Sequence, residues 1–333
     1  MERMKRFLKR RKRIIIIALL LIIGLIGAAY AFGFFDKKVE KNEEQKHIYR
    51  SQLTGEEVSQ EESERPILGI MIENSQEARP QAGLDSAGIV FETVTEGGIT
   101  RYLALFQEDM PAEVGPVRSI RPYFVDWAMG FDASIAHVGG SAEALEMVKN
   151  RNNAKSLNQF SHSKSYYRVN NRAAPHNMYA RTQDLRELQK EENHKKSSFK
   201  EIPRSDDSPS ATPDATNIKI DFSRPLFQAE FRYDQTTNSY TRYLAGQPHV
   251  DAATNQPITV KNLIVLKMPA PSINTIGSGE ALVFKNGSIQ KGTWKQSDFN
   301  NRLEILDAQS NPILLNRGNT WISATPSGRS ITY

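Results

Sequence analysis

The sequence predicts a mixed α/β (α+β) domain followed by a smaller, mainly β domain, both behind one N-terminal transmembrane helix. Three observations support this fold class. Residues 14–35 carry no charged side chain, residues 66–196 alternate strand-like and helix-like segments, and residues 218–333 contain short β-like runs separated by turns. The predicted organisation is a cytoplasmic basic flank at 1–13, an anchor at 14–35, a polar tether at 36–65, the α/β domain at 66–196, a linker at 197–217 and the β domain at 218–333.

Residues 14–35 have the length and composition of a membrane-spanning helix. A hydrocarbon core of about 30 Å needs roughly 20 helical residues, and Ile and Leu dominate this run. The first thirteen residues carry eight Lys or Arg and one Glu, and basic flanks stay on the cytoplasmic side. We therefore expect a single-pass cell-membrane protein with its N-terminus in the cytoplasm and its bulk outside. The alternative is a signal peptide cleaved after Ala31, in the small-x-small sequence Ala29-Tyr30-Ala31.

Charge and cysteine content exclude several classes of protein. The basic flank contributes +7 to the net charge of +5, so the other residues sum to −2. Nucleic-acid-binding domains gather Lys and Arg on their folded surface, so we expect no nucleic-acid partner. The chain has no cysteine, which excludes cysteine catalysis, thiolate metal sites and lipid attachment through Cys. A domain of this size can bury a core without disulfides.

The polar tether should hold the folded part away from the bilayer. Residues 36–65 are rich in charged side chains and show no apolar periodicity, and such a segment cannot bury enough surface to offset its ordering entropy. We expect order to begin near Pro66.

The first domain contains both β-like and helical patterns. Short apolar runs predict strands, and apolar residues at helical spacing predict helices. The strands are expected at 67–72, 88–94, 99–106 and 131–138, and the helices at 119–129, 141–149 and 182–191. Gly97-Gly98 predicts a hairpin between the second and third strands, which argues against a wholly parallel sheet.

The second domain follows a linker with three prolines among Ser, Asp and Thr. Asn286-Gly287 is typical of a tight hairpin turn. Strands are expected at 218–222, 229–233, 240–244, 263–268, 281–285, 313–315 and 321–324.

Several long phrases resemble a known family. In the first domain they are IMIENSQEARPQAGL (70–84), FETVTEGGITRYLALF (91–106), GPVRSIRPYFVDWA (115–128), HVGGSAEALE (137–146) and RAAPHNMY (172–179). In the second they are KNLIVLKM (261–268), GSGEALVFKNGSIQKGTW (277–294) and NRGNTWISATP (316–326). They resemble bacterial domain-of-unknown-function family 3048, the YerB-like envelope proteins, over residues 66–328. The resemblance implies membrane attachment, often through a lipidated Cys, which an apolar helix replaces in this chain. It implies no reaction and no catalytic residues.

Arg118 and Arg121 are the first candidate ligand-binding residues. Three positions apart at the start of a predicted helix, they should share one face. Guanidinium groups bind carboxylate or phosphate through two parallel hydrogen bonds, so these two can dock an anion. The alternative is internal ion pairing with Glu73, Glu92 or Glu96.

The segment His137-Val138-Gly139-Gly140-Ser141 is the second candidate. A strand that ends in two glycines before a helix opens leaves backbone N–H groups facing one point, which suits an anion. Ser141 would then be the N-cap. The simpler interpretation is a tight turn in which Ser141 only caps. A nucleophilic Ser141 would need His137 within hydrogen-bond reach, and the G-x-S-x-G signature is absent.

Glu92 and Glu96 are the third candidate, as an acid–base pair acting on a glycan. On a continuous strand they project to the same side, although a four-residue spacing of about 13 Å is long for such a pair. The alternative is that Glu96 is a turn residue.

His176 and Asn177 are the last candidates, in a loop that can close over a cleft or simply brace itself. The histidines show no close ligand spacing, so we expect no metal. Neither Gly-rich phosphate fingerprint is present, so we expect no cofactor.

The sequence leaves the activity open. We expect a binding or scaffold module for a cell-wall polymer or envelope protein, docked between the two domains at Arg118, Arg121, the Gly139-Gly140-Ser141 turn and His176. The alternative is a hydrolase or transferase with an anionic cell-wall substrate held by arginine and a His or Glu as general base. A purely structural tether is a third possibility.

Overall fold

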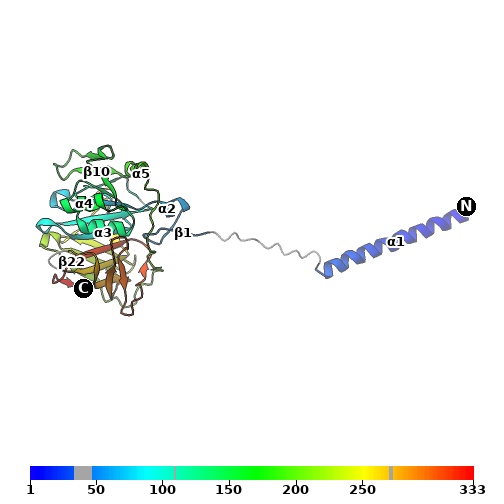
Figure 1. Cartoon of the computed structure of the whole chain (residues 1–333). Coiled ribbons are helices and arrows are strands. Elements are labelled where there is room, and N and C mark those ends of the chain that lie inside the picture. The colour runs from blue at the N-terminus through cyan, green and yellow to red at the C-terminus, as the bar shows by residue number, and fades with distance from the viewer. Residues whose placement is uncertain (34–46, 109, 270–272) are drawn as a thin grey trace. The chain divides into compact units, whose positions relative to one another are not determined.

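The computed structural model describes residues 1–33, 47–108, 110–269 and 273–333. The chain divides into two compact units, Met1–His47 and Ile48–Tyr333. The first contains α1 (Glu2–Ala31), which has no buried residue and is long and apolar enough to span a membrane by length and composition (Figure 1). Residues 34 and 35 of the predicted anchor lie outside the described residues.

One ten-stranded sheet runs through the second unit, in the order β20-β19-β18-β17-β22-β4-β5-β3-β7-β8. Its strands are β3 (Leu68–Glu73), β4 (Ile89–Val94), β5 (Thr100–Phe106), β7 (Ser134–His137), β8 (Lys155–Asn158), β17 (Asn262–Met268), β18 (Gly277–Lys285), β19 (Ser288–Gln296), β20 (Glu304–Leu306) and β22 (Thr320–Pro326). β22 pairs in parallel with β4, with Ile322 opposite Phe91. The sheet is therefore continuous from the first half of the sequence into the second.

A six-stranded sheet and several short pairings complete the β structure. The six strands are β12 (Asn217–Ile220), β13 (Ala229–Asp234), β14 (Ser239–Leu244), β15 (Gln247–Pro248), β16 (Thr259–Val260) and β23 (Ile331–Thr332). A three-stranded sheet contains β6 (Glu113–Val114), β9 (Tyr166–Arg168) and β10 (Met178–Arg181). The two-stranded pairs are β1 (Tyr49–Arg50) with β2 (Glu57–Val58), and β11 (Arg204–Ser205) with β21 (Leu315–Asn316).

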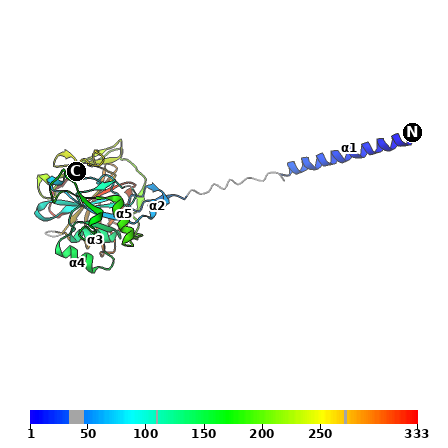
Figure 2. The ribbon, with the colours of Figure 1, turned by 90° about the horizontal axis from the view of Figure 1, so that it is seen from above.

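The helices cover the sheet unevenly. They are α2 (Gln60–Glu64), α3 (Pro122–Gly130), α4 (Ala142–Asn150) and α5 (Thr182–Glu191), with 3₁₀ turns η1 (Gln76–Ala78), η2 (Glu96–Gly98), η3 (Ser163–Ser165) and η4 (Pro225–Phe227). α3 and α4 lie together on one side of the unit (Figure 2).

The hydrophobic core lies on both faces of the ten-stranded sheet, because its central strands are buried on both sides. On one face, Phe91 and Ile322 pack with Phe124 and Trp127 of α3. The opposite face packs on the six-stranded sheet and on α5 through a second cluster that includes Trp321. The unit is thus built in layers around one central sheet.

The predicted fold class is confirmed: a mixed α/β half precedes a mainly β half behind an apolar N-terminal helix. β4 and β5 form the predicted hairpin around Gly97-Gly98. The helix predicted at 119–129 begins three residues later, at Pro122. Residues 118–121 are instead extended along the sheet: the Arg118 N–H donates to Met71 O at 2.8 Å, and the Ile120 N–H donates to Gly139 O at 3.1 Å. Arg118 and Arg121 therefore do not share a helix face.

The expectation that order begins near Pro66 was wrong, because residues 48–65 belong to the folded unit. Leu53 is fully buried in the core. The hydroxyls of Ser51 and Thr54 donate to the two carboxylate oxygens of Glu108, at 2.7 and 2.5 Å. These contacts involve polar side chains and one apolar residue, so the segment shows no apolar periodicity although it packs tightly.

Candidate functional site

The strands of the ten-stranded sheet that run in the same direction have their carboxyl ends along one edge of the sheet, the edge formed by strand ends. β3 is parallel to β7, and β4 is parallel to β22. β5 runs antiparallel to both β3 and β4, so these two strands also share a direction. Crevices at the carboxyl ends of such strands are the usual ligand sites of α/β sheets.

A cavity of about 920 Å³ lies at this edge, and we call it the edge crevice. Its walls come from both halves of the sequence. The first half contributes the segment 94–96, the start of α3 and the Ser141 turn, and the second half contributes Pro326 and the segment 273–275. Two helices begin beside it, so their free N–H groups and positive dipole ends face this region.

Arg121 and Glu96 form a bidentate ion pair in the edge crevice. Arg121 Nε and Nη2 donate to Oε1 and Oε2 of Glu96 at 2.5 and 2.8 Å. This hydrogen bonding lowers the pKa of Glu96. The Tyr123 hydroxyl donates to Val94 O at 3.1 Å and ties the first turn of α3 to the end of β4.

Arg101 is a buried cation beside this pair that sequence reasoning missed. Only 7% of the residue is exposed, Nη1 donates to Ser119 O at 2.7 Å, and Nε has no hydrogen-bond partner among the described residues. Burial, followed by the charges of Arg121 and Arg118, lowers the pKa of Arg101 to about 10. Its position inside an apolar strand-like run was the available signal, because an arginine there must face a buried environment.

Arg118 and His176 meet at a second cluster, on Glu73. Arg118 Nε lies 3.4 Å and His176 Nδ1 lies 3.0 Å from Glu73 Oε1. Ser75 Oγ is 3.1 Å from both that oxygen and His176 Nδ1. Glu73 Oε2 is buried without a hydrogen-bond partner among the described residues. These side chains do not line the edge crevice. Asn177 braces its own loop by donating to Val169 O and Arg172 O, each at 3.1 Å.

His137 and Ser141 do not form a nucleophile–base pair. The buried His137 ring donates from Nδ1 to Gly139 O and contacts Ser156 Oγ through Nε2, both at 2.8 Å. Burial lowers the pKa of His137 to about 4. Ser141 Oγ accepts the Ala144 N–H at 3.3 Å as the N-cap of α4.

Each of the two glycines in this turn is needed for a different reason. Gly139 has φ +59°, and a Cβ at Gly140 would lie 2.8 Å from the Ile120 side chain. The turn therefore serves close packing of residues 118–121 against the end of β7.

Glu92 and Glu96 are also separated, which excludes a carboxylate pair. Glu92 is fully buried on the face toward the six-stranded sheet. Its oxygens accept from Arg242 Nη2 at 2.8 Å, Trp321 Nε1 at 3.0 Å and Thr100 Oγ1 at 3.0 Å. Glu96 is the expected turn residue in η2.

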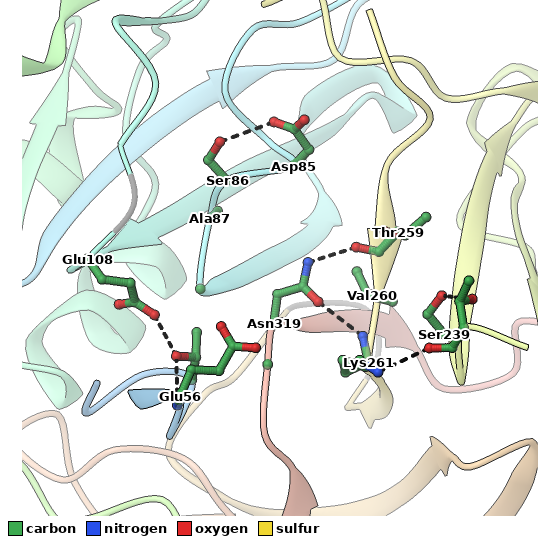
Figure 3. Close-up of a pocket in the computed structure, with 14 residues that line it drawn as sticks. Glu56, Asp85, Ser86, Ala87, Glu108, Ser239, Thr259, Val260, Lys261 and Asn319 are labelled. Carbon is green, nitrogen blue, oxygen red and sulfur yellow. Dashed lines mark hydrogen bonds between the residues drawn. The ribbon is translucent and has the colours of Figure 1, made fainter. Parts of the chain in front are cut away.

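A smaller cavity of about 370 Å³ lies elsewhere, between the start of β4 and Lys261 (Figure 3). Its charged groups are held by neighbours: Glu108 by Ser51 and Thr54, Asp85 by Thr254 and Ser86, and Lys261 by Asp207 (2.7 Å). No group of three or more His, Asp or Glu side chains suited to a metal occurs in the described part of the chain.

Comparisons with known proteins cover most of the second unit. Residues 53–196 match "Protein of unknown function (DUF3048) N-terminal domain", and residues 218–322 match its C-terminal domain. The "Putative lipoprotein YerB" of Bacillus subtilis (strain 168) is 30% identical over 290 residues, which are 83% of this chain and 86% of the relative. The crystal structure of the YerB protein from Bacillus subtilis is similar with a TM-score of 0.76 and 28% identity, over 85% of this chain and 99% of that chain. The fold, the two matched regions and the relative together show that this chain belongs to the DUF3048 family.

Proposed function

We propose that this protein is a membrane-anchored, extracytoplasmic binding module of the bacterial cell envelope. Its ligand is a cell-wall polymer or an envelope protein that enters the edge crevice. The observation that carries this proposal is a cavity of about 920 Å³ with walls from both halves of the chain and a buried arginine beside it. Pockets of roughly 300–1,000 Å³ commonly hold ligands.

The anchor is α1, with its basic end in the cytoplasm. The YerB relative is named as a lipoprotein, but this chain has no cysteine to carry a lipid, and α1 takes the place of that attachment. A reporter that fluoresces only in the cytosol, fused to Tyr333, tests the orientation. We expect no fluorescence, while the same reporter at Met1 should be bright. Fluorescence from the C-terminal fusion would contradict the proposed location.

A binding role is supported by how the candidate polar groups are used. Arg118 pairs with Glu73, Arg121 pairs with Glu96, and both ring nitrogens of His137 are engaged. An enzyme of the kind considered above would need a base aimed at a nucleophile or substrate, and these residues provide none.

Retention of envelope material tests the binding role. Residues 48–333 form a separate unit with its own core, so this fragment can be immobilised and exposed to isolated cell wall and envelope extract. We expect retention that falls in an Arg121→Gln variant and persists in Arg232→Gln, a surface arginine on β13. Retention no greater than that of an unrelated protein would overturn the proposal.

The Glu73 cluster supports a second candidate function, a hydrolase or transferase. A carboxylate on Nδ1 orients the ring and leaves Nε2 as the basic nitrogen, and His176 Nε2 has no hydrogen-bond partner among the described residues. Masses of muropeptides incubated with residues 48–333 test it. New products that vanish in His176→Ala would establish catalysis, and unchanged masses would exclude it for that substrate.

A further inference from the structure

We propose that Arg121, supported by Arg101, forms a subsite for the free carboxylate of a peptide, and that Glu96 is a built-in occupant which the ligand displaces. The inference rests on the proposed binding role of the edge crevice and specifies its ligand. It extends the site to Arg101 and gives Glu96 the role of competitor.

The Arg121–Glu96 pair has the geometry of a bound carboxylate. Two parallel N–H···O bonds at 2.5 and 2.8 Å are the arrangement by which a guanidinium recognises a carboxylate. The two partners differ in accessibility: the Arg121 side chain is 15% exposed and that of Glu96 is 65% exposed. The arginine is thus part of the crevice wall, and the carboxylate approaches it from solvent.

Displacement of Glu96 replaces one carboxylate by another on Arg121, so the two parallel hydrogen bonds and the charge pairing are retained. The backbone of the turn need not move, because Ser223 Oγ donates to Gly98 O and Arg224 Nη2 donates to Gly97 O at 2.5 and 2.9 Å. Rotation of the Glu96 side chain alone frees the guanidinium of Arg121.

Arg101 adds positive charge beside Arg121 and forms no ion pair within the part of the chain that the structure describes. Among the described residues it pairs with no carboxylate, and its one hydrogen bond goes to a backbone carbonyl. A buried charge without a counterion is costly. A ligand carboxylate that replaces Glu96 on Arg121 would keep negative charge next to Arg101, and the charge of Arg101 adds to the attraction for an anion at this point.

The walls of the edge crevice favour a peptide over a polyanion. Asp126 and Glu143 also line it, so its charged side chains sum to −1 with Glu96, Arg121 and Arg151 included. A polymer with a phosphate in every repeat would meet these carboxylates. A peptide presents one carboxylate, and its side chains and amides match the apolar and amide walls, among them Met147, Ile273 and Asn274.

The test is a titration of residues 48–333 with N-acetyl-alanyl-alanine, followed by NMR or calorimetry. We expect the wild type to bind it weakly, Glu96→Gln to bind it about tenfold more tightly, and Arg121→Gln to lose binding. The C-terminal amide of the same dipeptide should not bind. Glu230→Gln, which removes the partner of Arg232 on the surface of β13, is the matched control and should leave affinity unchanged.

The direction of the Glu96→Gln effect decides the proposal, because a misfolded variant cannot gain affinity. Equal or weaker binding by Glu96→Gln would overturn the competitor role, and so would displacement of the dipeptide by equimolar inorganic phosphate. Both outcomes leave the proposed binding role intact if envelope material is still retained and this retention falls in Arg121→Gln. Loss of all retention would instead refute the proposed function.

Discussion

The buried ion pair between Arg242 and Glu92 is the residue-level contact that joins the two halves. Both side chains have 0% exposure, and they belong to a closed hydrogen-bonded ring that links Glu92, Thr100, Asn74, Gln81, His249 and Arg242. Burial, followed by the charges of Arg242 and Arg79, holds the pKa of His249 well below its usual value. Neutral His249 accepts from Arg242 at Nδ1 and donates from Nε2 to Gln81.

Arg242→Met should lower the free energy of unfolding by about 3–5 kcal/mol, because it leaves Glu92 as a buried charge without its partner. The double variant Arg242→Met/Glu92→Leu should recover part of this loss. Denaturant unfolding of residues 48–333 measures both. Arg232→Met, on the neighbouring strand and paired with Glu230 at the surface, is the control and should change little. A loss in Arg242→Met no larger than in the control would contradict an anchoring role for the pair.

His137 should make the folded unit sensitive to acid. Burial lowers its pKa to about 4 from a usual value of 6.5, so between these values the unfolded chain binds a proton that the folded chain does not. His137 therefore does not reduce the free energy of unfolding above about pH 6.5. As the pH decreases toward 4, protonation of His137 in the unfolded chain lowers this free energy by about 3 kcal/mol. Denaturant unfolding should show that His137→Gln loses about that much less than wild type between pH 7 and pH 4. Between pH 7 and pH 9 the free energies of unfolding of wild type and His137→Gln should change with pH in the same way. Parallel curves over the whole range down to pH 4 would contradict the assignment.

Single residues were predicted unevenly from the sequence. The internal pairing considered for Arg118 and Arg121 included their observed partners, Glu73 and Glu96, but it also included Glu92, which pairs with Arg242. Arg242 was missed, although alternation places it on the same face of β14 as Tyr240 and Leu244, all three buried. A charged residue at an inward position of a strand was the readable signal, but its partner lies 150 residues away and leaves no local trace.

At the scale of elements, substitutions of Ser141 in the turn before α4 can distinguish a structural role of this residue from a catalytic one. Ser141→Ala should lower the free energy of unfolding by about 1 kcal/mol, the usual contribution of an N-cap, while Ser141→Asn should restore stability because asparagine also caps and adds no charge to the edge crevice. Thermal or denaturant unfolding measures the change, and retention of envelope material should be unaffected in both variants. Loss of retention in the asparagine variant with intact stability would show that the hydroxyl acts on a ligand.

The segment 48–65 should be needed for stability, although its composition is that of a tether. Residues 66–333 alone would lack Leu53, and Glu108 would lose both donors while Gln107 would lose its bonds to Ser63 O and Arg65 O. We expect residues 66–333 to have a lower Tm and to unfold at a lower urea concentration than residues 48–333. The control is removal of residues 1–47, which should leave the Tm of the folded unit unchanged. Equal melting of 48–333 and 66–333 would contradict the structural assignment.

At the scale of the whole molecule, the sequence predicted most elements but not how they join. Strand and helix patterns are local, so β3, β4, β5 and α5 were found close to their observed bounds. The pairing of β22 with β4 connects Ile322 to Phe91, and such a non-local contact has no periodicity to reveal it. The edge crevice depends on this pairing, because Pro326 and the segment after β17 reach it only when the two halves share one sheet. Two separately matched regions therefore act as one structural unit.

The two halves should fold together and not alone. β4 is fully buried except at Val94, and without β22 it would expose an apolar edge, which favours aggregation. A protease site inserted at 208–212, an exposed or half-buried stretch, allows cleavage after folding. We expect the nicked fragments to co-elute on gel filtration and unfold in one transition, while each fragment purified in urea should fail to refold until the other is added. If the fragment 48–207 alone gave a dispersed NMR spectrum, the shared sheet would be an association of two independent domains, and the edge crevice would then open and close with their docking.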